Sequence, residues 1–112
     1  MKLVTAIVRP HVVDGIRERL ETLGIHGMTI SEVQGFGRQG GHTEIYRGAE
    51  YKVNFLPKIK VEVVCDDAFI DEVIESVTKE AGSGKIGDGK IWVTEVSDVI
   101  RIRTLERGRD AL

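Results

Sequence analysis

The chain has 112 residues, of which 41% are hydrophobic and 30% charged, a size and composition that fit one compact domain. Its 16 basic and 18 acidic side chains leave a formal net charge of -2, which favours neither nucleic acid nor an anionic membrane as a partner, so any anion site has to be local. No apolar run approaches the roughly 18 residues of a membrane span and no leader is evident, so we expect a cytoplasmic protein.

The first half of the chain predicts a strand, a helix and a second strand. The β-branched stretch 2–8 predicts a buried strand that ends before Pro10. From 11 to 23, apolar side chains recur at helical spacing, and Gly24 is suited to a left-handed cap at the end of that helix. Residues 25–36 mix β-prone apolar and polar side chains, which predicts a second strand.

A long polar segment from Gly35 to Pro57 separates this strand from the next one. Hairpin loops usually close in about two to five residues, and a much longer polar loop in a compact domain is typically functional. The segment contains both tyrosines of the chain, Tyr46 and Tyr51, among charged side chains. We therefore expect a mobile arm that contacts other molecules.

The second half of the chain repeats the order of elements in the first. Residues 58–65 alternate apolar and polar side chains and predict a third strand, with the single cysteine on its apolar face. Asp66 and Asp67 are suitable caps for a helix that ends at Gly82, and residues 91–96 predict a fourth strand. This is the βαββαβ order of the α+β ferredoxin-like fold, which has a four-stranded antiparallel sheet.

Two clusters in the C-terminal part could bind an anion. The segment 82–90 is rich in glycine, so its N–H groups could turn toward a phosphate, and Lys85 and Lys90 add positive charge. Arg101 and Arg103 flank one isoleucine, so in an extended chain both guanidinium groups point the same way, as paired phosphate ligands do. The alternatives are an ordinary flexible connection for the first cluster and two solvated charges for the second.

Other kinds of site find little support in the sequence. Residues 84–90 have the spacing of a P-loop, but Ile91 stands where a serine or threonine has to bind magnesium, and a strand follows. His11, His26 and His42 fall in separate segments, and hydrolase motifs are missing, so we expect a protein that is not an enzyme. An RNA-recognition module of the same fold needs stacking aromatics on its first and third strands, which this chain lacks.

Three separated blocks together resemble one known family. They are GFGRQGGHTEIYRGAEY at 35–51, GKIGDGKI at 84–91 and IRIRT at 100–104. Across essentially the whole chain they are similar to the PII nitrogen-regulatory signal proteins. The resemblance implies a homotrimer of ferredoxin-like subunits that binds ATP or ADP between subunits, and 2-oxoglutarate with Mg²⁺ beside ATP.

The resemblance also assigns loops and site residues. It makes 37–55 the T-loop, 82–90 the B-loop and 101–112 the C-terminal tail with its C-loop. The implied nucleotide ligands include a phosphate group of backbone and basic residues, pocket residues, and a pair that closes on the adenine from the neighbouring subunit. These ligands are Ile7, Met28, Thr29, Gly35, Gly37, Arg38, Glu62, Val64, Gly87, Asp88, Gly89, Lys90, Arg101 and Arg103.

For 2-oxoglutarate the resemblance implies a site at the base of the long loop. Gln39 resembles the magnesium ligand, Lys58 the cation that pairs with a carboxylate, and Gly37 and Gly41 lie beside them. On its own, Lys58 is equally well an exposed surface lysine. Tyr51 matches a tyrosine that many bacterial relatives have uridylylated or adenylylated, the alternative being a contact residue that is never modified.

Implied targets are an ammonium transporter, a modifying enzyme of glutamine synthetase, a sensor kinase or a biosynthetic kinase, with no nucleic acid and a membrane only through the transporter. The rival hypotheses are a PII-like adenine-nucleotide sensor of another pathway without 2-oxoglutarate, and a slow ATP hydrolase. The chain departs from the family pattern at Gly40, where lysine is common, at Gly82 and Ser83, where a basic residue and threonine are common, and at Leu105, where glycine is usual. We expect a more flexible loop base and less charge near the nucleotide. The family pattern does not predict the conformation of the tail around Leu105.

Overall fold

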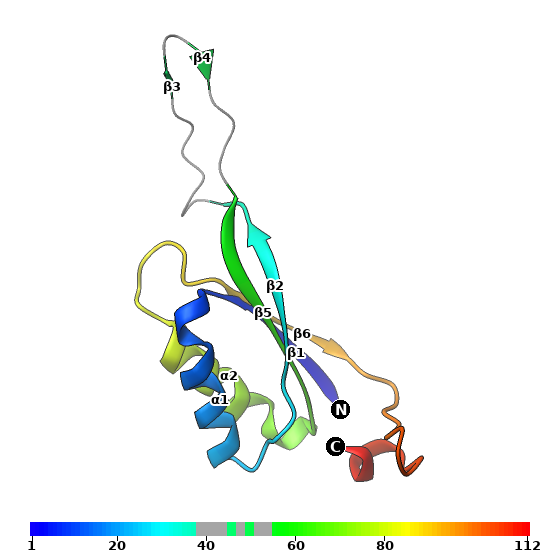
Figure 1. Cartoon of the computed structure of the whole chain (residues 1–112). Coiled ribbons are helices and arrows are strands. Elements are labelled where there is room, and N and C mark those ends of the chain that lie inside the picture. The colour runs from blue at the N-terminus through cyan, green and yellow to red at the C-terminus, as the bar shows by residue number, and fades with distance from the viewer. Residues whose placement is uncertain (38–44, 47–48, 51–54) are drawn as a thin grey trace.

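A computed structural model describes residues 1–37, 45–46, 49–50 and 55–112 of the chain. Four strands form one antiparallel sheet in the order β2-β5-β1-β6, namely β1 (Lys2–Val8), β2 (Thr29–Gly35), β5 (Leu56–Cys65) and β6 (Lys90–Glu95). The helices α1 (Val13–Thr22) and α2 (Ile70–Ala81) cover one face of this sheet (Figure 1). The predicted ferredoxin-like α+β fold is therefore confirmed.

The core lies between that sheet face and the two helices. Alternate residues of β1 and β5 point toward the helices because side chains of a strand alternate between its faces. The buried apolar residues are Val4, Ala6, Val8, Val12, Ile16, Leu20, Val61, Val63, Cys65, Val73 and Val77. The single cysteine is thus a buried apolar residue, as its place in the alternating strand predicts, and burial raises the pKa of its thiol.

Each helix begins with a 3-10 turn, η1 (Pro10–Val12) before α1 and η2 (Asp67–Phe69) before α2. The prediction that Asp66 and Asp67 cap the second helix is wrong. The Asp66 side chain makes no cap hydrogen bond, and its Oδ2 lies 2.6 Å from Nε of Arg109, while Oδ1 of Asp67 lies 2.9 Å from the N-terminal ammonium. Both carboxylates therefore bind distant parts of the chain, and they hold the two termini at the β5–α2 junction (Figure 1).

The predicted element boundaries hold with small shifts. The second strand begins at Thr29 rather than Ile25, because residues 23–28 turn from α1 to the sheet, and Gly24 takes the expected positive φ of 83°. The third strand begins two residues early, at Leu56, and the fourth spans Lys90–Glu95.

Neither α1 nor α2 covers the other sheet face (Figure 1), and the C-terminal 3-10 helix η3 (Gly108–Ala111) reaches only one end of it, near Leu3 and Val64. Trp92 on β6 and Val64 on β5 are on this face and are 45% and 36% exposed. Leu3 and Ile7 of β1 lie beside them and are partly buried. Large apolar side chains on this face are therefore partly exposed to solvent.

The long segment between β2 and β5 has regular structure at two short places. The strands β3 (Ile45–Tyr46) and β4 (Ala49–Glu50) pair antiparallel as a small second sheet, which the sequence did not predict. At the foot of the segment the rings of Phe36 and Phe55 lie 6.0 Å apart between centroids. The predictions for Arg38, Gln39, Gly40, Gly41 and Tyr51 lie outside the described residues.

Within the described residues, no helix is long and apolar enough to cross a membrane.

Candidate functional site

The glycine-rich connection between α2 and β6, residues 82–89, is shaped by three glycines in a conformation that other residues rarely adopt (Figure 1, yellow). Gly84, Gly87 and Gly89 have φ values of 78°, 103° and 102°. Gly89 also lies against β1, where a Cβ would be 1.8 Å from the Ile7 carbonyl oxygen. An ordinary flexible connection would not need three such positions, so this loop has one specific backbone path.

The carboxylate of Asp88 restrains the loop backbone through hydrogen bonds within the loop. Its Oδ2 accepts the N–H groups of Ser83 and Gly84 at 2.7 and 2.8 Å, and its Oδ1 accepts the Ser83 hydroxyl at 2.5 Å. These donors, Ser83 foremost and Arg9 as well, hold the pKa of Asp88 well below its usual range. The Asp88 side chain is therefore engaged within the loop, and only its main chain is left to meet a phosphate.

Two basic side chains from the sheet bind the outer part of the loop. Arg9, at the end of β1, donates from Nη1 to Oδ1 of Asp88 at 2.7 Å and from Nη2 to the Ile86 carbonyl at 2.8 Å. Lys58 of β5 donates from Nζ to the Gly87 carbonyl at 3.1 Å. Together they join the sheet to both sides of the Gly87 turn.

Lys58 is buried, with only 5% of its surface exposed, so the alternative of a surface lysine is wrong. Burial lowers the pKa of its ammonium, the nearby Arg9 lowers it further, and Asp88 opposes both effects. A buried ammonium is stable only with acceptors around it, and a ligand carboxylate is the strongest acceptor that a small metabolite can offer.

Register places further predicted residues around this loop. Ile7 pairs with Lys90 on one side and with Lys60 on the other. Val33 pairs with Lys58, and Gly35 follows two residues later at the end of β2. One end of the sheet therefore holds Ile7, Gly35, Lys58 and the stretch from Gly87 to Lys90.

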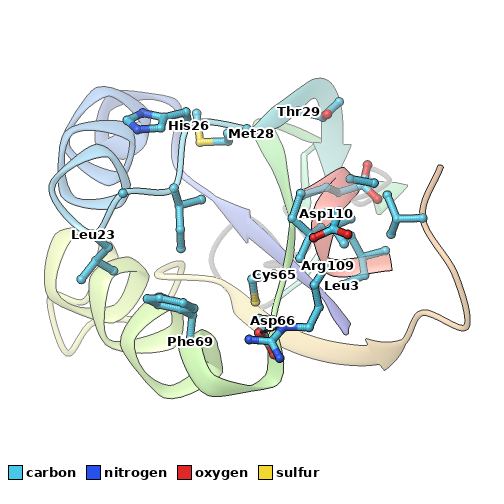
Figure 2. Close-up of a pocket in the computed structure, with 18 residues that line it drawn as sticks. Leu3, Leu23, His26, Met28, Thr29, Cys65, Asp66, Phe69, Arg109 and Asp110 are labelled. Atoms are coloured by element: carbon cyan, nitrogen blue, oxygen red, sulfur yellow. Dashed lines mark ion pairs between the residues drawn. The ribbon is translucent and has the colours of Figure 1, made fainter. Parts of the chain in front are cut away.

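A second group of predicted ligands lines a separate cavity of about 1090 Å³. It contains Met28, Thr29, Glu62 and Val64, together with Phe69 and the C-terminal residues Arg109 to Leu112 (Figure 2). Thr29 pairs with Glu62, and Val64 pairs with Leu3, four residues along β1 from Ile7. At about 3.3 Å per residue, Val64 is about 13 Å along the sheet from Ile7, whereas Glu62, which pairs with Thr5, is only about 7 Å away. None of the residues at the loop end of the sheet lines this cavity.

The predicted arginine pair lies in neither group, and the expected extended segment is wrong. Ile100 bridges to Arg107, and the N–H of Leu105 donates to the Arg101 carbonyl at 2.7 Å, so the chain turns between them. Arg101 binds Glu106 at 3.0 Å and the Leu112 carbonyl at 3.1 Å, while Arg103 is exposed in the turn. The alternation that would align the two guanidinium groups is therefore lost.

Sequence reasoning missed Arg9. Its local sequence, a basic residue before Pro10 at the end of a strand, is common, and only the position of residues 82–89 beside that strand end reveals its partners. Among the residues that the structure describes, no group of three or more His, Cys, Asp or Glu side chains could hold a metal ion, and the predicted magnesium ligand Gln39 lies outside them.

A ferredoxin-like sheet with a shaped glycine loop at one end and a long insertion between its second and third sheet strands defines a small α+β domain of the PII type. The family model for nitrogen regulatory protein P-II matches residues 1–106. The chain is 58% identical over 112 residues to nitrogen regulatory protein GlnK of Escherichia coli. It is 54% and 56% identical over 112 residues to the nitrogen regulatory P-II proteins of Azospirillum brasilense and Haemophilus influenzae. Each match covers 100% of both chains.

The chain therefore belongs to the nitrogen regulatory protein P-II family, and it is a regulatory signal protein of nitrogen metabolism. As a member of a regulatory family it acts on target proteins.

Proposed function

We propose that this protein senses ATP, ADP and 2-oxoglutarate, and that it reports their levels to its targets through residues 37–55. The observation that supports this most is the conformation of loop 82–89, which hydrogen bonds to Asp88 and Arg9 restrain. Because the Asp88 carboxylate is engaged inside the loop, what remains for an anion is backbone N–H groups and the ammonium groups of Lys85 and Lys90. Such an arrangement suits phosphate oxygens.

The two groups of predicted ligands support a nucleotide site shared between chains. Ile7, Gly35, Glu62 and Val64 of one subunit would line the nucleotide pocket beside its loop 82–89, which would hold the phosphates. Met28 and Thr29, which lie in the cavity away from that loop, would close the pocket around the adenine from the next subunit. The sheet face away from α1 and α2, with Trp92 and Val64 partly exposed, offers apolar surface for such a contact. We therefore propose a homotrimer in which each chain contributes to two sites.

Lys58 supports a 2-oxoglutarate site next to the phosphates. An ammonium has three donors, and the Gly87 carbonyl accepts one of them. In the proposed site Lys58 would pair with a 2-oxoglutarate carboxylate, and Gln39 would supply an oxygen ligand to Mg²⁺, whose charge would offset that of the dicarboxylate and the triphosphate. Gly37 and Gly41 complete this site.

The proposed output is a shift of population. ATP with 2-oxoglutarate favours one arrangement of the segment around Arg38, ADP favours another, and target proteins select between them. Tyr51 is the proposed site of nucleotidylylation, which would add bulk and negative charge to the surface that targets contact. The proposed targets are those of nitrogen metabolism, among them an ammonium transporter and the glutamine synthetase modifying enzyme.

Calorimetric titration tests this proposal. We expect ATP and ADP to bind the purified protein, and 2-oxoglutarate to bind only when Mg-ATP is present. Lys58→Gln should abolish the 2-oxoglutarate heat, whereas Lys79→Gln, which removes an exposed charge on α2, should leave it unchanged.

Two results would favour the rival functions. Nucleotide binding without any heat from 2-oxoglutarate would indicate an adenine-nucleotide sensor of another pathway. The structure is compatible with such a sensor, because the Gly87 carbonyl accepts one hydrogen bond from the Lys58 ammonium without any dicarboxylate. Substantial steady-state release of phosphate from ATP would indicate an enzyme.

A further inference from the structure

Arg9 is the one arginine that joins β1 to the loop at residues 82–89 in the described part of the chain. It follows the last residue of β1 and precedes Pro10, in extended backbone with φ -68° and ψ 146°. Proline fixes its own backbone and restricts the residue before it to extended conformations. The direction in which Arg9 leaves the sheet is therefore set by local sequence.

The guanidinium of Arg9 spans two acceptors that lie two residues apart in the loop. Nη1 donates to the Asp88 carboxylate at 2.7 Å, and Nη2 donates to the Ile86 carbonyl at 2.8 Å. A planar fork can hold two acceptors in a fixed relation, whereas the ammonium of lysine is a single point charge. Arg9 thus fixes the two flanks of Gly87 relative to each other and to the sheet.

The loop needs such fixing. Three glycines at positive φ make many other backbone paths available to residues 82–89 in the absence of restraints. The restraints among the described residues are the Asp88 hydrogen bonds to Ser83 and Gly84, the Lys58 contact and the two bonds of Arg9. Arg9 also offsets the negative charge of Asp88, which would otherwise repel a phosphate at the same loop.

We propose that Arg9 is a positioning residue for the nucleotide phosphates, which holds loop 82–89 in its binding conformation before the nucleotide arrives. This inference rests on the proposed function. Arg9 acts through Asp88 and Ile86, since both terminal nitrogens of its side chain are bound to the loop. Apparent affinity falls in proportion to the fraction of loops that are competent to bind, so loss of the fork weakens binding without removal of any nucleotide ligand.

The test compares Arg9→Gln, Arg9→Lys and a control, Arg17→Gln, in the full-length protein. Arg17 is an exposed arginine on α1 that pairs with Glu21, so its loss changes the net charge equally and leaves the loop alone. Two quantities are measured: amide hydrogen exchange of Ser83 and Gly84 without nucleotide, and the dissociation constants of ATP and ADP by calorimetry.

We expect Arg9→Gln to speed exchange at Ser83 and Gly84 and to weaken ATP and ADP binding about tenfold, the effect of one lost charge-assisted hydrogen bond. Arg9→Lys should give an intermediate effect on both quantities, because it keeps the charge and loses the fork. Arg17→Gln should match the parent protein. Circular dichroism of each variant confirms that the fold is retained.

A second variant keeps the test decisive if Arg9→Gln is poorly folded. Asp88→Asn removes the negative charge and one of the two carboxylate oxygens that Arg9 and the loop share, so its effect and that of Arg9→Lys should not add in the double variant. Additive losses would overturn the proposal.

The remaining outcomes separate the inference from the proposed function. A parent protein that binds neither ATP nor ADP overturns both. If the parent protein binds and Arg9→Gln binds equally well, the inference alone is wrong. Weaker binding with unchanged exchange in the nucleotide-free protein would mean that Arg9 contacts the phosphates directly, and this too would overturn its role as a positioning residue.

Discussion

Gly89→Ala should destabilise the protein far more than an ordinary glycine substitution. The new Cβ would be 1.8 Å from the Ile7 carbonyl oxygen and 2.9 Å from the Ile7 carbonyl carbon, and both are main-chain atoms of a central strand. A side chain could rotate away, but here the loop or the β1–β6 ladder has to move. The backbone at Gly89 also has φ 102°, which alanine adopts only at a cost.

The magnitude follows from these two terms. A non-glycine residue in such a region costs about 1–3 kcal/mol. Displacement of Lys90 from Ile7, the first pair of the ladder, adds about 0.5–1.5 kcal/mol for each hydrogen bond lost. We therefore expect a loss of about 3 kcal/mol, which is a large share of the roughly 5–15 kcal/mol that stabilises a typical domain.

The assay is urea unfolding of the nucleotide-free protein at fixed protein concentration, with Gly24→Ala as the matched control. Gly24 also has positive φ, 83°, but a Cβ there would meet nothing within 4 Å. The control contains the conformational cost alone, about 1 kcal/mol, so the difference between the variants isolates the contact with Ile7. The reasoning is refuted if Gly89→Ala is no less stable than Gly24→Ala.

Three further predictions concern the tail and the loop. Leu105 has φ 62°, so Leu105→Gly should raise the free energy of unfolding by up to about 1 kcal/mol in the same urea assay, and a loss of stability would show that the leucine side chain compensates for its backbone. Because the pKa of folded Asp88 is lowered, its hydrogen bonds are fully present above the ordinary aspartate pKa of about 3.9. They are lost only as the pH falls through the lower pKa of the folded state. The NMR signal of the Ser83 amide should therefore stay unchanged from pH 7 to about 4 and shift only in stronger acid. Arg109→Gln should speed hydrogen exchange in the last residues by removing the contact with Asp66, yet change global stability by less than about 1 kcal/mol because Arg109 is largely exposed; a larger change would give this ion pair a structural role.

Periodicity was sufficient to predict the sheet and both helices. An element that packs one face against the core needs apolar side chains at the spacing of that face. Residues 58–65 show the spacing of a strand, and residues 11–23 show that of a helix. Glycine positions were informative for the same local reason, since Gly24 takes the positive φ that its place after a helix predicts.

Long-range partners were not predictable from the sequence. Asp66 and Asp67 have the chemistry of helix caps, but the N-terminal ammonium and Arg109 are stronger partners, and the fold brings them close. Lys58 is on the sheet face away from the helices, yet it is buried and its ammonium binds the Gly87 carbonyl of loop 82–89, a partner 29 residues away that no local pattern indicates.

The candidate site was predictable where a local motif defines it and not where tertiary structure does. The glycine-rich segment was recognised from its composition, whereas Arg9 depends on sheet order, which places the end of β1 beside the loop. The predicted alignment of Arg101 and Arg103 failed because a bridge from Ile100 to Arg107 closes a turn that a period-two pattern does not indicate.

The Phe36–Phe55 contact closes the long insertion at its base. The two rings meet at 6.0 Å just beyond the last pair of the β2–β5 ladder, Gly35 with Leu56, so the entry and exit of the insertion are fixed by the domain itself. For a flexible insertion closed at its base, each doubling of length costs only about 0.6 kcal/mol. Residues between these rings can therefore be exchanged, lengthened or replaced by a foreign peptide while the sheet folds as before, which makes this position a natural acceptor for grafted sequences.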